Sequence, residues 1–177
     1  MKFILNFIAV CFLSINLFAQ QNHVYNGNFE QYTQCPNVTG LINKATGWDN
    51  FNLGTADYHN SCHSGTPSGV PLNYFGHQPA ASGNGYIGLI EFTDPTNKFR
   101  EYVTSYMTPL QVGRIYEVSM SVSVSNRALY FDNGLGVYFY DTGMTLYQTG
   151  ALLDTLKPQV TYTHYGQLSD TVNWLRL

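Results

Sequence analysis

A cysteine between two histidines is the part of the chain with the clearest potential for chemistry. His59, Cys62 and His63 lie within the pentapeptide His-Asn-Ser-Cys-His. A thiolate beside an imidazole can bind zinc or act as an activated nucleophile. An exported chain with two thiols most simply oxidises them to each other, and Cys35 is the available partner. We therefore predict a Cys35–Cys62 disulfide, which would stabilise the fold by about 3–4 kcal/mol on the chain-entropy model.

Three glutamates, Glu91, Glu101 and Glu117, raise the possibility of a glycosidase with two carboxylates. Their spacing does not place any pair on one concave face. Glu101 follows Arg100, and Glu117 belongs to the polar face of a predicted strand, so we predict solvated charges. The chain contains no G-x-S-x-G, H-E-x-x-H or glycine-rich phosphate loop. A catalytic role is therefore not expected.

The first nineteen residues read as a secretory signal peptide. Lys2 precedes an apolar run that ends at Ala19, a small residue suited to signal peptidase. A membrane anchor is the alternative, but Asn6, Ser14 and Asn16 interrupt the run, which is shorter than the roughly 20 residues that span a bilayer. We predict cleavage before Gln20, export of the protein, and no transmembrane segment in the mature chain.

Composition indicates an all-β protein with no nucleic-acid partner. Only 11% of the residues are charged, whereas 15% are aromatic, and Gly, Asn, Ser, Thr and Tyr are abundant. The net charge of −3 and the scattered basic residues argue against nucleic acid. Residues 20–177 are long enough for a single domain with its own core.

The strongest strand signal runs from Ile115 to Ser125, where apolar residues alternate with Glu117 and a series of serines. Further strands are predicted at residues 86–92, 102–107, 135–140 and 160–165. Short strands separated by turn residues are typical of an antiparallel sandwich or jelly roll. Residues 50–82 lack periodicity, so we predict a long loop there, which would be a natural place for function.

The C-terminal residues Val172–Leu177 resemble the opening of another strand. A sandwich ending there would leave an apolar edge unpaired. We therefore predict that the domain is C-terminally incomplete and lacks one or more closing strands.

Six motifs follow one another along the mature chain. They are NGNFEQYTQCP (Asn26 to Pro36), ATGWDN (Ala45 to Asn50), TADYHNSC (Thr55 to Cys62), GVPLNYFGHQPAASGNGYIGL (Gly69 to Leu89), REYV (Arg100 to Val103) and TPLQVGRIYEVSMSVSVS (Thr108 to Ser125). In this order they resemble the N-terminal galactose-binding-like module of secreted and outer-membrane proteins of bacteria that use the type IX secretion route. The resemblance implies a jelly-roll sandwich, an extracellular or outer-membrane location, and a downstream domain that is OmpA-like or serves in sorting.

Aromatic residues in or beside the predicted loop are candidates for ligand binding, since ring faces and a few fixed polar groups hold sugars. The candidates are Trp48, Asp57, Tyr58, Asn73, Tyr74, His77, Asn84 and Tyr86. Each aromatic ring could instead have a structural role and pack at the rim of the sandwich or in the disulfide loop. Trp48 is the residue for which we most expect this structural role.

A structural calcium ion is a further possibility, although no cofactor is required. Sandwiches related to the resembled module often tie their first and last strands together through oxygen ligands, and Asn28 and Glu30 lie where such ligands would begin.

These observations favour a non-catalytic, exported β-sandwich module that binds carbohydrate or another cell-surface ligand as part of a larger protein. A structural or adhesion domain without a small-ligand pocket is the first alternative. A secreted glycan-active hydrolase is the second.

Overall fold

The structure of the protein is a computed structural model that describes residues 21–91, 93, 96, 98–129, 134–141, 144, 147, 149–150, 153–162 and 168–177. The predicted signal peptide, residues 1–19, lies outside the described residues. Within the part that is described, no helix is long and apolar enough to cross a membrane.

Short antiparallel strands make up nearly all the regular structure, as the composition predicted. The elements are the 3₁₀ turn η1 (Ile42–Lys44) and the strands β1 (Trp48–Asn50), β2 (Asp57–Asn60), β3 (Leu72–Asn73), β4 (Gly76–His77), β5 (Gly85–Gly88), β6 (Val103–Ser105), β7 (Ser121–Val122), β8 (Gly136–Val137), β9 (Val160–Thr161) and β10 (Leu175–Arg176). They form the antiparallel pairs β1–β6, β2–β5, β3–β4, β7–β10 and β8–β9. The all-β class is confirmed, and the complete two-sheet sandwich stays a prediction.

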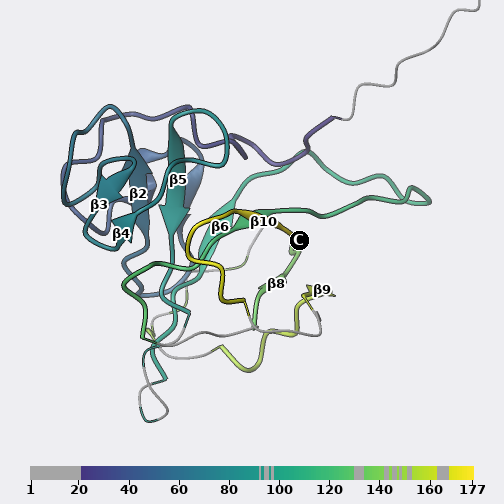
Figure 1. Ribbon diagram of the computed structural model, residues 1–177. Coiled ribbons are helices and arrows are strands. Elements are labelled where there is room, and N and C mark those ends of the chain that lie inside the picture. The colour runs from purple at the N-terminus through teal and green to yellow at the C-terminus, as the bar shows by residue number, and fades with distance from the viewer. Residues whose placement is uncertain are drawn as a thin grey trace, which may run out of the picture.

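Figure 1 shows how these pairs are distributed. The strands β2, β3, β4 and β5 lie together at one side, β8 and β9 lie at the other, and β6 and β10 lie between them. The chain between β6 and β7 extends away from the body as a long arm. Val112 and Ile115 in this arm are fully exposed.

Strands are present in the segments predicted in the C-terminal half. The strands β7 and β8 are shorter than their sequence patterns, and residues 163–165 of the strand predicted at 160–165 lie outside the described residues. Within residues 115–125, β7 covers only Ser121–Val122, yet the backbones of Met120 and Leu177 also exchange hydrogen bonds of 2.9 and 3.3 Å. From Tyr116 to Ser121 half-buried and exposed residues alternate, as predicted. The prediction of a strand within Val172–Leu177 is confirmed by β10.

The long loop predicted at residues 50–82 is wrong in part, because this stretch contains β2, β3 and β4. All four residues of β2 are buried. A strand is usually recognised in a sequence by apolar alternation, whereas β2 reads Asp-Tyr-His-Asn and has polar residues on both of its faces. The absence of alternation therefore concealed one of the most buried strands of the molecule.

The interior is correspondingly mixed in character. Its buried apolar residues are Ile42, Ala45, Phe51, Ala56, Tyr58, Leu153 and Leu168. Its buried polar residues are Asn26, Asn52, Asp57, His59, Asn60, Ser68, Asn73 and Glu101. Buried polar groups are usually hydrogen-bonded, so the fold depends on a network of specific partners as well as on apolar contact. The Nδ1 atom of His59 is an exception, because it is buried without a hydrogen-bond partner.

The predicted disulfide is confirmed. Cys35 and Cys62 are joined with an S–S distance of 2.12 Å and a Cα–Cα distance of 6.0 Å, across a sequence separation of 27 residues. Cys62 therefore has no free thiolate, and it serves as neither a zinc ligand nor a nucleophile in this structure.

Candidate functional site

The structure separates the eight predicted ligand-binding residues into two sets. Asn73, Tyr74 and His77 belong to the β3–β4 hairpin, and Asn73 contacts Tyr86 on β5. The other four lie at different places: Trp48, Asp57, Tyr58 and Asn84. The first set defines the candidate site.

Tyr74 occupies the tip of this hairpin. Leu72 pairs with His77 and Asn73 with Gly76, which leaves Tyr74 and Phe75 as a two-residue loop. Gly76 has φ of 130°, and a Cβ there would overlap the side-chain oxygen of Asn126, so only glycine fits. Tyr74 is 62% exposed at a sharply defined turn.

Asn73 anchors the hairpin from inside. Its Nδ2 donates to the Gly69 carbonyl at 3.2 Å and to the Tyr86 hydroxyl at 2.6 Å. Its Oδ1 accepts the backbone N–H of Phe75 at 2.9 Å. Asn73 is only 2% exposed, so it holds the loop in place and does not itself present a surface to a ligand.

An aromatic cluster packs against the hairpin. The His59 ring lies 5.1 Å from Tyr86 and 5.9 Å from Phe75, centroid to centroid, and Tyr86 packs edge-on against Trp174 at 5.5 Å. Trp174 donates from its indole nitrogen to the Pro79 carbonyl at 2.8 Å. Burial raises the pKa of Tyr86 although the bond from Asn73 opposes it, which keeps the phenol neutral. The support is therefore rigid and uncharged.

Two residues that were not predicted complete the site. Arg127 Nη1 donates to the Tyr74 carbonyl at 2.7 Å, and its backbone N–H donates to Ser125 Oγ at 3.1 Å. Asn126 exchanges hydrogen bonds of 3.4 Å with the backbone of His77. The signal in the sequence was the polar turn directly after the strongest predicted strand.

We call the surface formed by Tyr74, Phe75, His77, Asn126 and Arg127 the hairpin platform. It presents an exposed phenol ring, and a guanidinium is hydrogen-bonded to the backbone of that same tyrosine. Such a surface can stack on an apolar ring face and donate hydrogen bonds beside it.

Trp48 and Tyr58 have structural roles. Trp48 Nε1 donates to the Asn26 carbonyl at 3.0 Å, and its ring packs on Phe29 at 4.9 Å. Tyr58 is fully buried, donates to the Phe29 carbonyl at 2.8 Å and accepts from Asn60 at 2.8 Å. Burial raises the pKa of Tyr58 to about 12. Neither hydroxyl nor indole nitrogen is available to a surface ligand.

Glu30 and Asn84 bind each other. Glu30 Oε1 accepts the backbone N–H groups of Asn84 at 2.7 Å and Gly85 at 3.1 Å, and Oε2 accepts from Asn84 Nδ2 at 2.9 Å. Desolvation opposes ionisation of Glu30, but these hydrogen bonds outweigh it and lower its pKa. Asn28 is exposed. Among the described residues no group of three or more His, Cys, Asp or Glu could hold a metal ion, and calcium binding stays a prediction.

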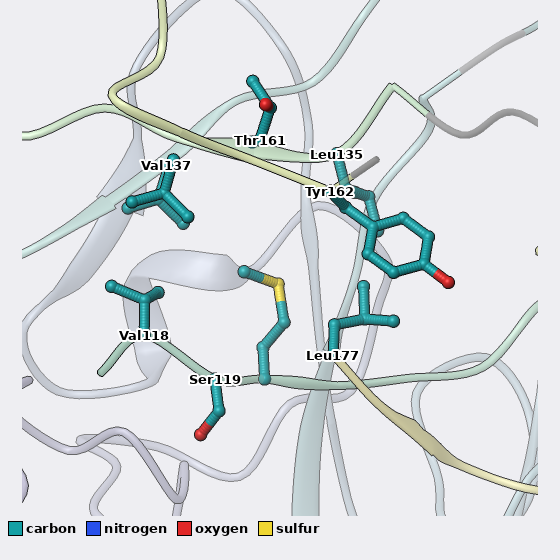
Figure 2. Close-up of a pocket in the computed structure, with 10 residues that line it drawn as sticks. Val118, Ser119, Leu135, Val137, Thr161, Tyr162 and Leu177 are labelled. Carbon is teal, nitrogen blue, oxygen red and sulfur yellow. The ribbon is translucent and has the colours of Figure 1, made fainter. Parts of the chain in front are cut away.

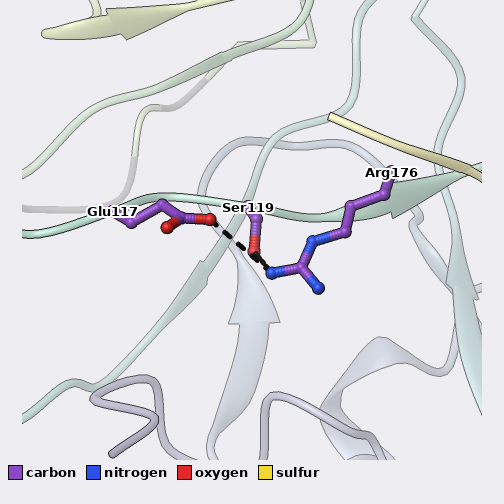
Figure 3. Close-up of polar contacts among 3 residues, drawn as sticks. All are labelled: Glu117, Ser119 and Arg176. Atoms are coloured by element: carbon purple, nitrogen blue, oxygen red, sulfur yellow. Dashed lines mark hydrogen bonds and ion pairs between the residues drawn. The ribbon is translucent and has the colours of Figure 1, made fainter. Parts of the chain in front are cut away.

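The prediction of a solvated charge is wrong for Glu101 and confirmed for Glu117. Glu101 is 1% exposed; its Oε1 accepts Thr55 N–H at 2.9 Å and Thr55 Oγ1 at 3.1 Å, and its Oε2 accepts Ile90 N–H at 2.8 Å. Glu117 lies in the exposed segment that leads into β7, 3.6 Å from Arg176, which also donates to Ser119 (Figure 3). These two glutamates engage different partners and do not form a carboxylate pair.

Asp57, the last of the predicted site residues, is a second buried carboxylate. It is 3% exposed, and its Oδ1 accepts the Gly40 N–H at 2.5 Å. Burial raises its pKa from 3.8 to about 6, with the Gly40 bond opposing the shift and the charge of Glu101 adding to it. Between pH 3.8 and about 6, Asp57 is protonated in the folded protein and ionised in the unfolded chain. The free energy of unfolding therefore falls as pH rises through this range.

Asp57→Asn keeps an oxygen that can accept from Gly40 and removes the buried charge. We expect it to raise the free energy of unfolding by about 2–3 kcal/mol at pH 7 and to have almost no effect at pH 4. Urea denaturation over this pH range measures the difference. Asp49→Asn, which removes an exposed carboxylate, is the control for net charge, and an equal effect of Asp57→Asn at both pH values would contradict the prediction.

Titration of His59 makes the free energy of unfolding depend on pH in the opposite direction. Burial lowers its pKa from 6.5 to about 4, and the Ser68 backbone offsets only part of this. Between these values the unfolded chain binds the proton first, so stability rises with pH. Between pH 4 and 6 the effects of Asp57 and His59 on the free energy of unfolding largely cancel in the natural protein. In the Asp57→Asn variant only the effect of His59 should remain, so its stability should rise with pH over this range.

A separate apolar groove of about 180 Å³ opens between the segment that leads into β7 and the β8–β9 pair. Val118, Leu135, Val137 and Leu177 surround it (Figure 2). All four are half-buried, so part of this apolar face is exposed. Exposed apolar surface of this kind often marks a contact with another protein.

Comparison of the chain with protein-family models, with curated proteins and with solved structures finds no match.

Proposed function

We propose that the protein is a non-catalytic, exported β-sandwich module that binds carbohydrate through the hairpin platform. The observation that carries this proposal is the exposed Tyr74 ring, held at the tip of a hairpin whose loop is fixed by Asn73. Sugars offer apolar ring faces edged by hydroxyls, and an immobilised tyrosine stacks on them at little conformational cost. His77 belongs to the same hairpin, Arg127 is hydrogen-bonded to the Tyr74 carbonyl, and both side chains can donate hydrogen bonds.

Export and the complete sandwich are parts of the same proposal. The predicted signal peptide and the disulfide support export, and the order of the six motifs supports both export and the sandwich. A downstream domain is proposed on the resemblance alone.

Retention by insoluble polysaccharides tests the binding, with calcium or with a chelator. We expect retention of the natural protein and a loss of about tenfold in affinity for Tyr74→Ala, since removing a stacking ring costs on the order of 1.4 kcal/mol. Tyr106→Ala is the matched control because Tyr106 is 75% exposed in the arm, outside the platform. Equal affinities of the natural protein and Tyr74→Ala would contradict the proposed site, and dependence on calcium would revive the metal prediction.

The alternative is a structural or adhesion domain without a small-ligand pocket. The apolar groove favours it, together with exposed aliphatic side chains such as Val112, Ile115 and Leu129. In the same experiment, absence of retention on every polysaccharide combined with concentration-dependent self-association would favour this alternative.

A further inference from the structure

We infer that the hairpin platform selects acidic sugars and that Arg127 determines this specificity. The inference rests on the proposed carbohydrate binding at Tyr74. The ligand chemistry that it names is a carboxylate or sulfate group on a sugar whose ring stacks on the tyrosine.

The first step is that Arg127 is held in position. One guanidinium nitrogen, Nη1, donates to the Tyr74 carbonyl at 2.7 Å. The turn that carries it is fixed as well, because Ser125 Oγ accepts the Arg127 backbone N–H at 3.1 Å and itself donates to the Phe75 carbonyl at 2.5 Å. The guanidinium is thus tied to the same two-residue loop that presents the ring.

The second step is that this guanidinium has hydrogen-bonding capacity left. It carries five N–H donors, and a single one is used in the bond to Tyr74. No carboxylate among the described residues forms an ion pair with Arg127, whereas Arg176 pairs with Glu117. The side chain is exposed, in a chain whose net charge is −3.

The third step is the match between this arrangement and an acidic sugar. A planar guanidinium forms two parallel hydrogen bonds with a carboxylate, and it also binds sulfate oxygens. A neutral sugar would stack on the Tyr74 ring, and the Arg127 guanidinium would stay hydrated. A sugar that carries an anionic substituent would use both groups at once, and this gives the platform a preference for it.

The test compares retention on polygalacturonate, on a sulfated galactan and on a neutral galactan at 150 mM salt. We expect the natural protein to bind at least one acidic polymer about tenfold or more tightly than the neutral one. Arg127→Gln should lose this preference, and Tyr74→Ala should weaken binding to all polymers. The polymer that is preferred identifies the anionic group as carboxylate or sulfate.

Two further variants separate recognition from positioning and from net charge. Arg127→Lys can still donate to the Tyr74 carbonyl but lacks the planar fork, so it should keep binding to the neutral galactan and lose most of the preference for polygalacturonate. Arg114→Gln removes the same charge from the exposed arm and should change nothing. Thermal unfolding of each variant confirms that it is folded.

The outcomes distinguish the inference from the function on which it rests. Equal binding to acidic and neutral polymers, unchanged by Arg127→Gln, would overturn the acidic specificity and leave carbohydrate binding intact. An equal loss in Arg114→Gln and Arg127→Gln would also overturn it, because binding would then follow net charge. Absence of binding to all three polymers would overturn both.

Discussion

Replacement of both Cys35 and Cys62 by alanine is expected to lower the free energy of unfolding by about 3–4 kcal/mol. The bridge closes a loop with a sequence separation of 27 residues, and it therefore removes many conformations from the unfolded chain. The loop contains η1 and β2, which supply Ile42 and Tyr58 to the core. Loss of the bridge should thus weaken the most buried part of the molecule.

Guanidinium denaturation of the natural protein and of the double variant, each with and without dithiothreitol, measures this effect. The reductant should destabilise the natural protein by a similar amount and leave the double variant unchanged. A loss of less than about 1 kcal/mol would show that the unfolded loop is already constrained by other means.

Glu101→Ala is expected to destabilise the protein by about 3 kcal/mol, although a sequence-based reading places this residue in solvent. The variant leaves the N–H groups of Thr55 and Ile90 and the Thr55 hydroxyl without their acceptor at a part-buried site. An unsatisfied buried donor costs about 1–3 kcal/mol, and the exposure of Thr55 allows water to recover part of the loss.

Urea denaturation with two comparison variants checks this prediction. Glu101→Gln retains one acceptor oxygen and should lose less than Glu101→Ala. Glu117→Ala removes an exposed carboxylate whose ion pair with Arg176 is solvated, and should cost less than about 1 kcal/mol. Equal losses in Glu101→Ala and Glu117→Ala would mean that the buried hydrogen bonds contribute little.

The confirmed predictions concern two kinds of feature. One is set by the apolar pattern of neighbouring residues, and the other by covalent chemistry. From Tyr116 to Ser121 the alternation predicted which side chains are half-buried, because an extended segment with one covered face repeats every two residues. The prediction is wrong for Ser123 and Ser125, which were expected on the polar face and are half-buried as well. The disulfide followed from the two cysteines that lie outside the predicted signal peptide, and it required no knowledge of the fold.

The ligand-binding residues stay a prediction, and the structure shows which of them lie together. The hairpin brings Asn73, Tyr74 and His77 to one place with Tyr86. Sequence could not separate the exposed Tyr74 from the fully buried Tyr58, since both follow polar neighbours in segments without periodicity. It also missed Arg127, which reaches Tyr74 from 53 residues away.

The sequence by itself determined the all-β class, the disulfide and the strands of the C-terminal half, because alternation, turn residues and cysteine count act over short distances or through covalent bonds. Only the tertiary structure decided that Asp57, His59 and Glu101 are interior residues. A polar side chain carries no mark in the sequence that says whether water or protein will satisfy it. For Glu101 the answer lies with Thr55, 46 residues away along the chain, and only folding brings the two together.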